Sequence, residues 1–130
     1  MVVFAICTSV ISLAGSKGRS QEFLAGSSRE TVSAAIFTNC ACCHGRQGQG
    51  GFGPPFASNP DLSNTAMIVR QVLGGSEHMP AFRNQLSDLE VADVVSHIRT
   101  HFGNQFGSIS VAEVRALRQL DKPHVAHRTL

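Results

Sequence analysis

The sequence predicts one all-α domain, because its regular segments show helical spacing and helix-start signals and none shows the alternation of a β-strand. Two Ser-x-x-Glu patterns, at 87–90 and 110–113, are capping boxes that begin helices. The 130 residues are enough for one domain. The formal net charge of +2 gives no case for nucleic-acid binding.

Residues 1–16 are predicted to be a secretory signal peptide. The apolar run from Val2 to Gly15 is shorter than the roughly 20 residues of a membrane-spanning helix and ends in small residues. No Lys or Arg precedes this run, so an uncleaved anchor and an N-terminal helix of the fold stay open as alternatives. Cys7 would leave with the signal, and no lipid anchor is expected. Residues 17–28 are rich in Ser, Gly and charge and are interpreted as a linker.

A first helix is predicted to begin near Arg29, after a serine that can cap it. Its apolar residues Val32 and Ile36 share one stripe with Cys40 and Cys43, at spacings of four, four and three. This face is expected to pack on the core, with Phe37 on the flank. From 45 to 53 there are five glycines, followed by two prolines, so no regular element is expected there.

Three further helices are predicted from caps and apolar stripes. Asn64 can cap a short helix that ends at Gly74–Gly75, and the box at 87–90 begins a helix that runs to about residue 102. The box at 110–113 begins a C-terminal helix, and residues 121–130 are expected to be frayed. The stripes comprise Ile68, Val69 and Val72; Val91, Val94, Val95, Ile98 and Phe102; and Val111, Val114, Leu117 and Leu120.

The pentapeptide 40–44, Cys-Ala-Cys-Cys-His, contains Cys-x-x-Cys-His, the attachment sequence of a c-type haem. On a helix Cys40 and Cys43 lie about one turn apart on one face, where both can reach vinyl groups at one edge of a porphyrin. His44 then offers an imidazole as the proximal iron ligand. The third thiol, Cys42, is interpreted as a small helical residue without a ligand role.

Met79 is the candidate sixth ligand, because a thioether is a soft donor suited to haem iron. Pro80 stiffens the chain beside it. Met67 is a rival thioether, but its apolar neighbours favour ordinary helix packing. His97 and His101 are four residues apart, without a carboxylate or Cys at matching spacing along the chain. They are interpreted as solvent-facing or edge-packing side chains rather than as a metal site.

Four segments resemble the class I c-type cytochromes, especially single-haem domains associated with periplasmic dehydrogenases: 40–45, 51–57, 79–82 and 98–104. The resemblance implies a small cytochrome c fold of about four to five helices wrapped round one covalently bound haem. It implies a cytochrome c domain over 29–103 and an extra helix and tail over 104–130. It also implies that His44 and Met79 are the axial ligands and that the carbonyl of Pro54 accepts the imidazole N–H. Cys42 and His97 depart from the usual pattern.

With both axial positions filled, the predicted function is one-electron transfer and not catalysis. The resemblance implies that electrons pass in the periplasm from a dehydrogenase toward a respiratory acceptor. A haem subunit or domain of a larger dehydrogenase complex, or a fragment of a multi-haem protein, is the first alternative. A gas-binding haem sensor or haem enzyme, and a zinc-binding module built on the cysteines and His44, are the others.

Overall fold

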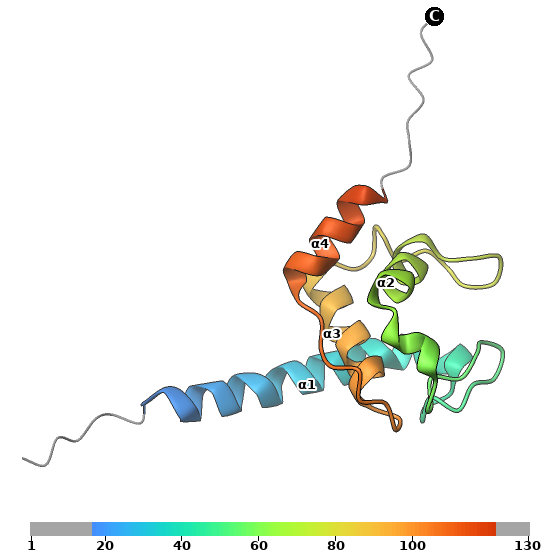
Figure 1. The fold of residues 1–130 in the computed structure, drawn as a ribbon. Helices are drawn as coiled ribbons and strands as arrows, with labels where there is room; N and C mark the ends of the chain where they lie inside the picture. Colours follow the sequence, from blue (N-terminus) through green and yellow to red (C-terminus); the bar gives the residue numbers. More distant parts are fainter. Residues whose placement is uncertain (1–16, 122–130) are drawn as a thin grey trace, which may run out of the picture.

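The computed structural model describes residues 17–121, with side chains from residue 28 onward. The described part of the chain is helical and contains no strand, which confirms the predicted all-α class (Figure 1). The helices are α1 (Lys17–His44), the short 3₁₀ helix η1 (Pro60–Ser63), α2 (Thr65–Gly74), α3 (Asp88–Thr100) and α4 (Val111–Leu120). The predicted signal peptide, residues 1–16, and most of the C-terminal tail lie outside the described residues.

Three helices begin where their caps predict. The side chain of Asn64 accepts a hydrogen bond from an amide in the first turn of α2. Ser87 and Glu90 form a reciprocal capping box at the start of α3, and Ser110 and Glu113 do the same at α4. Hydrogen bonds donated by the Ser87 amide and hydroxyl lower the pKa of the Glu90 carboxyl. These starts are local, because each depends on residues within one turn of the chain.

The first helix begins earlier than predicted. Helix α1 starts at Lys17 and not near Arg29, so residues 17–28 are helical, and the prediction of a linker without regular structure is wrong for this segment. The segment contains no Pro, and its Lys, Arg, Gln, Glu, Leu and Ala favour a helix, whereas its two glycines weaken it without ending it. The N-terminal part of α1 projects away from the other helices (Figure 1), which explains why it shows no apolar period.

The buried face of α1 also differs from the predicted one. Val32 is 48% exposed, whereas Ser33 and Phe37 are buried. The Ser33 hydroxyl donates to the carbonyl of Arg29 at 2.8 Å, so this small polar side chain is satisfied where it is buried. Phe37, expected on the flank, belongs to the core, and its ring centroid lies 5.0 Å from that of Phe102. The core face is therefore turned from the predicted stripe toward Phe37.

Helix α3 is the centre of the core. It packs against α1 on one side and α4 on the other (Figure 1), and it ends at Thr100 rather than near 102. Phe102 has a positive φ of 57°, a conformation uncommon for an aromatic residue. The buried apolar residues are Phe37, Leu62, Ile68, Val69, Val72, Leu73, Val91, Ala92, Val94, Val95, Ile98, Ile109 and Val114. Within the described residues, no helix has the length and apolar character that crossing a membrane requires.

Candidate haem site

An apolar cavity of about 480 Å³ lies between the C-terminal end of α1, α2, α3 and the loop that joins α2 to α3. A volume in this range is typical of cofactor and small-molecule sites. The cavity brings together Cys40, His44 and Met79, whereas Cys43 and Pro54 do not line it. The remaining lining residues are Ile36, Asn39, Phe56, Val72, Pro80, Phe82, Gln85, Leu86, Val94 and Ile98.

The three thiols of the attachment motif occupy the last turns of α1. Cys40 and Cys43 are half-buried, and Cys42 is exposed. Burial raises the pKa of the Cys40 thiol, and the nearby thiols Cys42 and Cys43 add to the effect. The Cys42 thiol donates to the carbonyl of Asn39 at 3.2 Å, and its sulfur lies 3.7 Å from that of Cys43. Cys40 alone of these thiols lines the cavity.

His44 is buried and its ring is held from two sides. Its Nδ1 lies 2.8 Å from the carbonyl oxygen of Pro54. Because a carbonyl oxygen only accepts, Nδ1–H is the donor, and this leaves Nε2 with a free lone pair for a metal. The ring stacks on Phe56, with centroids 4.2 Å apart and planes 17° apart. A Cβ on Gly53 would meet the His44 ring at 2.7 Å, so the loop approaches the imidazole as closely as glycine allows.

Met79 is half-buried and lies on a loop fixed mainly by its backbone. The Met79 carbonyl accepts a hydrogen bond from the Ser76 amide at 2.8 Å. The side-chain amide of Gln71 donates to the Met79 sulfur at 3.5 Å. Gly75 has a φ of +68°, and a Cβ there would lie 2.4 Å from the Met79 carbonyl oxygen. The turn that presents Met79 therefore requires glycine.

The residues present fit a haem group. An imidazole with one nitrogen already bonded to a carbonyl and a thioether on another segment both line one apolar cavity. These are the two donors that c-type cytochromes use for iron. Cys40 lies on the same wall as His44, four residues before it on α1. Gly53 and Gly75 let the chain pass close to His44 and Met79, respectively. A side chain at either glycine would displace its neighbour.

Comparison with known proteins decides the family. The family model described as cytochrome C oxidase, cbb3-type, subunit III, matches residues 28–98, more than half of the chain. The chain belongs to this family. It is thus a c-type cytochrome, a haem-dependent electron-transfer component that is not itself an enzyme. The resemblance read from the sequence is confirmed.

Individual relatives agree with this assignment. The cytochrome c subunit of the quinone alcohol dehydrogenase of Gluconobacter oxydans (strain 621H) is 36% identical over 103 residues, which covers 65% of this chain and 21% of that protein. The subunits with the same description from Gluconacetobacter polyoxogenes and Komagataeibacter europaeus are each 33% identical over 100 residues, with the same coverage. The cytochrome therefore spans about a fifth of the length of these curated relatives.

Asn104 is a site-supporting residue that sequence reasoning did not find. It is buried, and its side-chain amide donates to the carbonyls of Phe56 at 2.8 Å and Ile98 at 2.9 Å. Its side-chain oxygen accepts from the Asn59 amide at 3.2 Å. Asn104 therefore fixes the segment that carries the ring stacked on His44. The only sequence signal was its place in 98–104, one of the two less specific of the four family-like segments.

Arg99 fixes the neighbouring loop in the same way. Its buried guanidinium donates to the carbonyls of Leu62, Ser63, Phe106 and Gly107 and to the hydroxyl of Thr65. Five N–H donors in a fixed fork suit such a set of acceptors. The side chain ties η1 and the start of α2 to the end of α3. No pattern local to Arg99 predicts these partners, which come from both sides of it along the chain.

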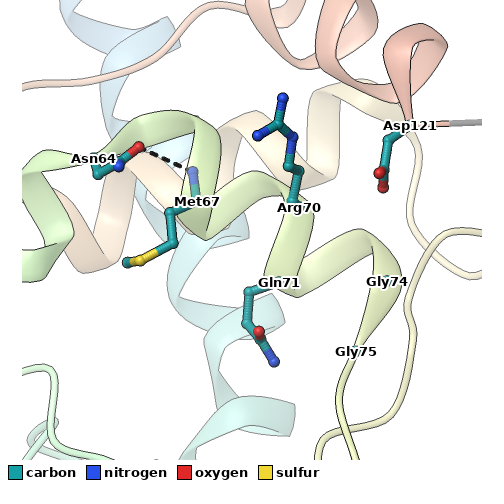
Figure 2. A pocket seen from close by; sticks show the side chains of 7 residues that line it. All are labelled: Asn64, Met67, Arg70, Gln71, Gly74, Gly75 and Asp121. Carbon is teal, nitrogen blue, oxygen red and sulfur yellow. Dashed lines mark hydrogen bonds between the residues drawn. The ribbon is translucent and has the colours of Figure 1, made fainter.

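Met67, the rival thioether, lies outside the haem cavity. It is 44% exposed and lines a separate open hollow of about 440 Å³ along α2, shown in Figure 2. In that view Met67 and Gln71 point to one side of α2, and Arg70 points to the other, where Asp121 lies. The hollow contains no His or Cys. Its position favours Met79 over Met67 as the sulfur available to the cavity.

Proposed function

We propose that the cytochrome binds one haem c through thioether bonds to Cys40 and Cys43, with His44 and Met79 as axial ligands. The observation that carries the proposal is the shared cavity, which His44 and Met79 both line and in which the Pro54 carbonyl fixes the His44 tautomer. The position of Cys43, one turn after Cys40 on α1, suits attachment at the same edge of a porphyrin.

The chain's own residues restrict what this site does. A bound haem supplies a one-electron couple between ferric and ferrous iron. If His44 and Met79 hold the iron as proposed, they would leave no ligand position for oxygen or peroxide. The bond from His44 to the Pro54 carbonyl orients the imidazole and raises its basicity. Apolar walls that include Val72, Leu86 and Ile98 exclude water, which favours the ferrous state.

The proposed setting is the periplasm. The predicted signal peptide over 1–16 would export the chain to the periplasm, the compartment in which c-type haem is attached. We propose a cytochrome domain over 29–103, followed by an extra helix and tail over 104–130. The family match over 28–98 agrees with the first boundary. The donor would be a periplasmic dehydrogenase and the acceptor a respiratory protein, both met through small transient contacts.

A second candidate is a haem subunit or domain of a larger dehydrogenase complex. It is favoured by the description of the relatives, which are cytochrome c subunits of a quinone alcohol dehydrogenase. The greater length of these relatives also favours this role, because the matched part of this chain covers only 21% of each of them. Size-exclusion chromatography of a native extract distinguishes the two roles. A free carrier elutes apart from the dehydrogenase activity, and a subunit elutes with it.

The ligand set is tested on protein made with a haem-attachment system. Colour that stays on the polypeptide in acid-acetone shows covalent attachment, and loss of the colour contradicts the proposal. Met79→Ala should open the sixth position, so that the ferrous protein binds carbon monoxide and its reduction potential falls. Met67→Ala is the matched control and should behave like the wild type. A reduced spectrum unchanged by Met79→Ala excludes Met79 as a ligand.

A further inference from the structure

A second group of ligand-type side chains lies where α1 passes alongside α3 (Figure 1). Glu30 comes from α1, and His97 and His101 lie one turn apart at the end of α3. One Glu30 carboxylate oxygen, Oε1, is 3.2 Å from His97 Nδ1 and 3.0 Å from His101 Nε2. The sequence favoured solvent-facing or edge-packing imidazoles, because it offers no carboxylate at matching spacing along the chain. In the structure a carboxylate reaches both rings from another helix.

The contacts of His101 direct its Nε2 at the Glu30 carboxylate. Its Nδ1 lies 2.9 Å from the His97 carbonyl oxygen, which only accepts, so Nδ1 must carry a hydrogen. In the neutral ring Nε2 then presents a lone pair to a carboxylate oxygen 3.0 Å away. A metal ion bound by both atoms would turn these two facing lone pairs into a favourable contact. A ring N–H donated to a backbone carbonyl is also the usual support of a metal-bound imidazole.

The surrounding contacts hold the group in place. His97 is buried, and its ring packs against those of Phe37 and Phe102, with centroids 5.3 and 5.6 Å away. Burial, together with the neighbouring His101, lowers the pKa of His97, and the neutral ring is the form that binds a metal. One residue before Glu30, Arg29 donates twice to the buried carboxylate of Asp93 on α3, at 2.7 and 3.2 Å. This pair fixes α1 against α3 at the level of Glu30.

We propose that Glu30, His97 and His101 form a binding site for one divalent transition-metal ion of the zinc class. Two imidazoles and a carboxylate are a common donor set for Zn²⁺, with the fourth tetrahedral position left to water. Two ligand atoms that each lie about 2.0–2.1 Å from a tetrahedral zinc ion are about 3.3 Å from one another. The Glu30 oxygen lies 3.2 and 3.0 Å from the two ring nitrogens, close to that separation. The ligand atoms of all three residues lie within 4.8 Å of one another. Because His97 faces Glu30 with Nδ1, binding there would place the ring hydrogen of His97 on Nε2.

The site is separate from the haem cavity. The rings of Phe37 and Phe56 lie between His97 and His44, and none of the three proposed ligands lines the cavity. An ion at this position would join α1 to the end of α3. It would thus stabilise the folded cytochrome without occupying an axial position of the haem.

The test is a Zn²⁺ titration of the full-length ferric holoprotein by calorimetry near pH 7.5. His124 and His127 are replaced by Ala in every sample, so that only the proposed site is measured. We expect one ion per chain and an affinity that falls at least about tenfold in Glu30→Gln and in His101→Ala, because even second-sphere changes cost 10–100-fold. Asp61→Asn is the charge-matched control and should bind like the parent protein.

A second measurement separates binding from damage to the fold. Zn²⁺ should raise the unfolding temperature of the parent protein and of Asp61→Asn, but not that of Glu30→Gln. An unchanged haem spectrum in each variant shows that the fold is intact. The proposal is overturned if the parent protein binds no stoichiometric Zn²⁺, or if Glu30→Gln and His101→Ala, correctly folded, bind it as tightly as the parent.

Discussion

Gly53→Ala tests how closely the loop must approach His44. A Cβ at position 53 would lie 2.7 Å from His44 Cε1, 2.8 Å from Nδ1 and 3.0 Å from Nε2. Ordinary contacts with a Cβ begin at 3.4 Å, so the ring or the loop must move by about 0.7 Å, the difference between 3.4 and 2.7. A shift of that size stretches the 2.8 Å bond from His44 Nδ1 to the Pro54 carbonyl to about 3.5 Å, where little of it remains.

The loop has little freedom to move instead of the ring. The Gly53 amide donates to the Cys43 carbonyl at 2.9 Å, which ties position 53 to the last turn of α1. We therefore expect Gly53→Ala to lower the free energy of unfolding by about 1–3 kcal/mol, the usual cost of an added methyl group in a packed site. The haem reduction potential should shift as well, because the proposed iron ligand His44 loses its supporting hydrogen bond.

The measurements are denaturant unfolding of the ferric holoprotein and a redox titration. Gly74→Ala is the matched control, because a Cβ at the end of α2 meets nothing within 4 Å. It should leave both the stability and the potential near those of the wild type. If Gly53→Ala matches Gly74→Ala in both measurements, the close approach of the loop to His44 is not a constraint and the reasoning fails.

Three further predictions concern other parts of the domain. Asn104→Leu should cost about 3 kcal/mol, since it removes three hydrogen bonds and leaves buried carbonyls unsatisfied, while the exposed control Gln105→Leu should cost little; equal thermal midpoints would refute this. Cys42→Ala should leave the yield of holoprotein intact, because this thiol is exposed and outside the cavity, and a large loss of haem would show otherwise. Glu90→Ala should be less stable than the wild type at neutral pH. Because the folded-state pKa of Glu90 is lowered, this gap should close as pH falls through that value, and a pH-independent gap would contradict the capping box.

Sequence reasoning succeeded where the signal is local. The starts of α2, α3 and α4 follow from the caps Asn64, Ser87 and Ser110, each of which bonds within one turn of its own helix. The attachment motif is equally local, because one turn of α1 places Cys40, Cys43 and His44. These features need no knowledge of how the helices pack.

It failed where a helix face is chosen by a distant partner. Val32 is as apolar as the stripe requires, yet it is exposed, and Ser33 is buried beside it. The choice depends on where α3 meets α1, which the spacing of apolar residues in α1 does not specify. The contacts of Glu30 are set by a distant partner as well, because its two histidine partners lie at the end of α3. A pattern search along one helix cannot find a ligand contributed by another.

The two proposed axial ligands differ in how the chain holds them. His44 ends a long helix, is buried, donates to the Pro54 carbonyl and stacks on Phe56, whose own carbonyl is fixed by Asn104. Met79 is half-buried on a loop, and among the described residues its sulfur accepts one long hydrogen bond, from the exposed side chain of Gln71. Because the contacts that fix His44 are more numerous and better buried, the proximal side is the rigid reference of the site. Substitutions in the loop that carries Met79 can therefore change iron ligation and the reduction potential. They should destabilise the fold less than substitutions around His44 would.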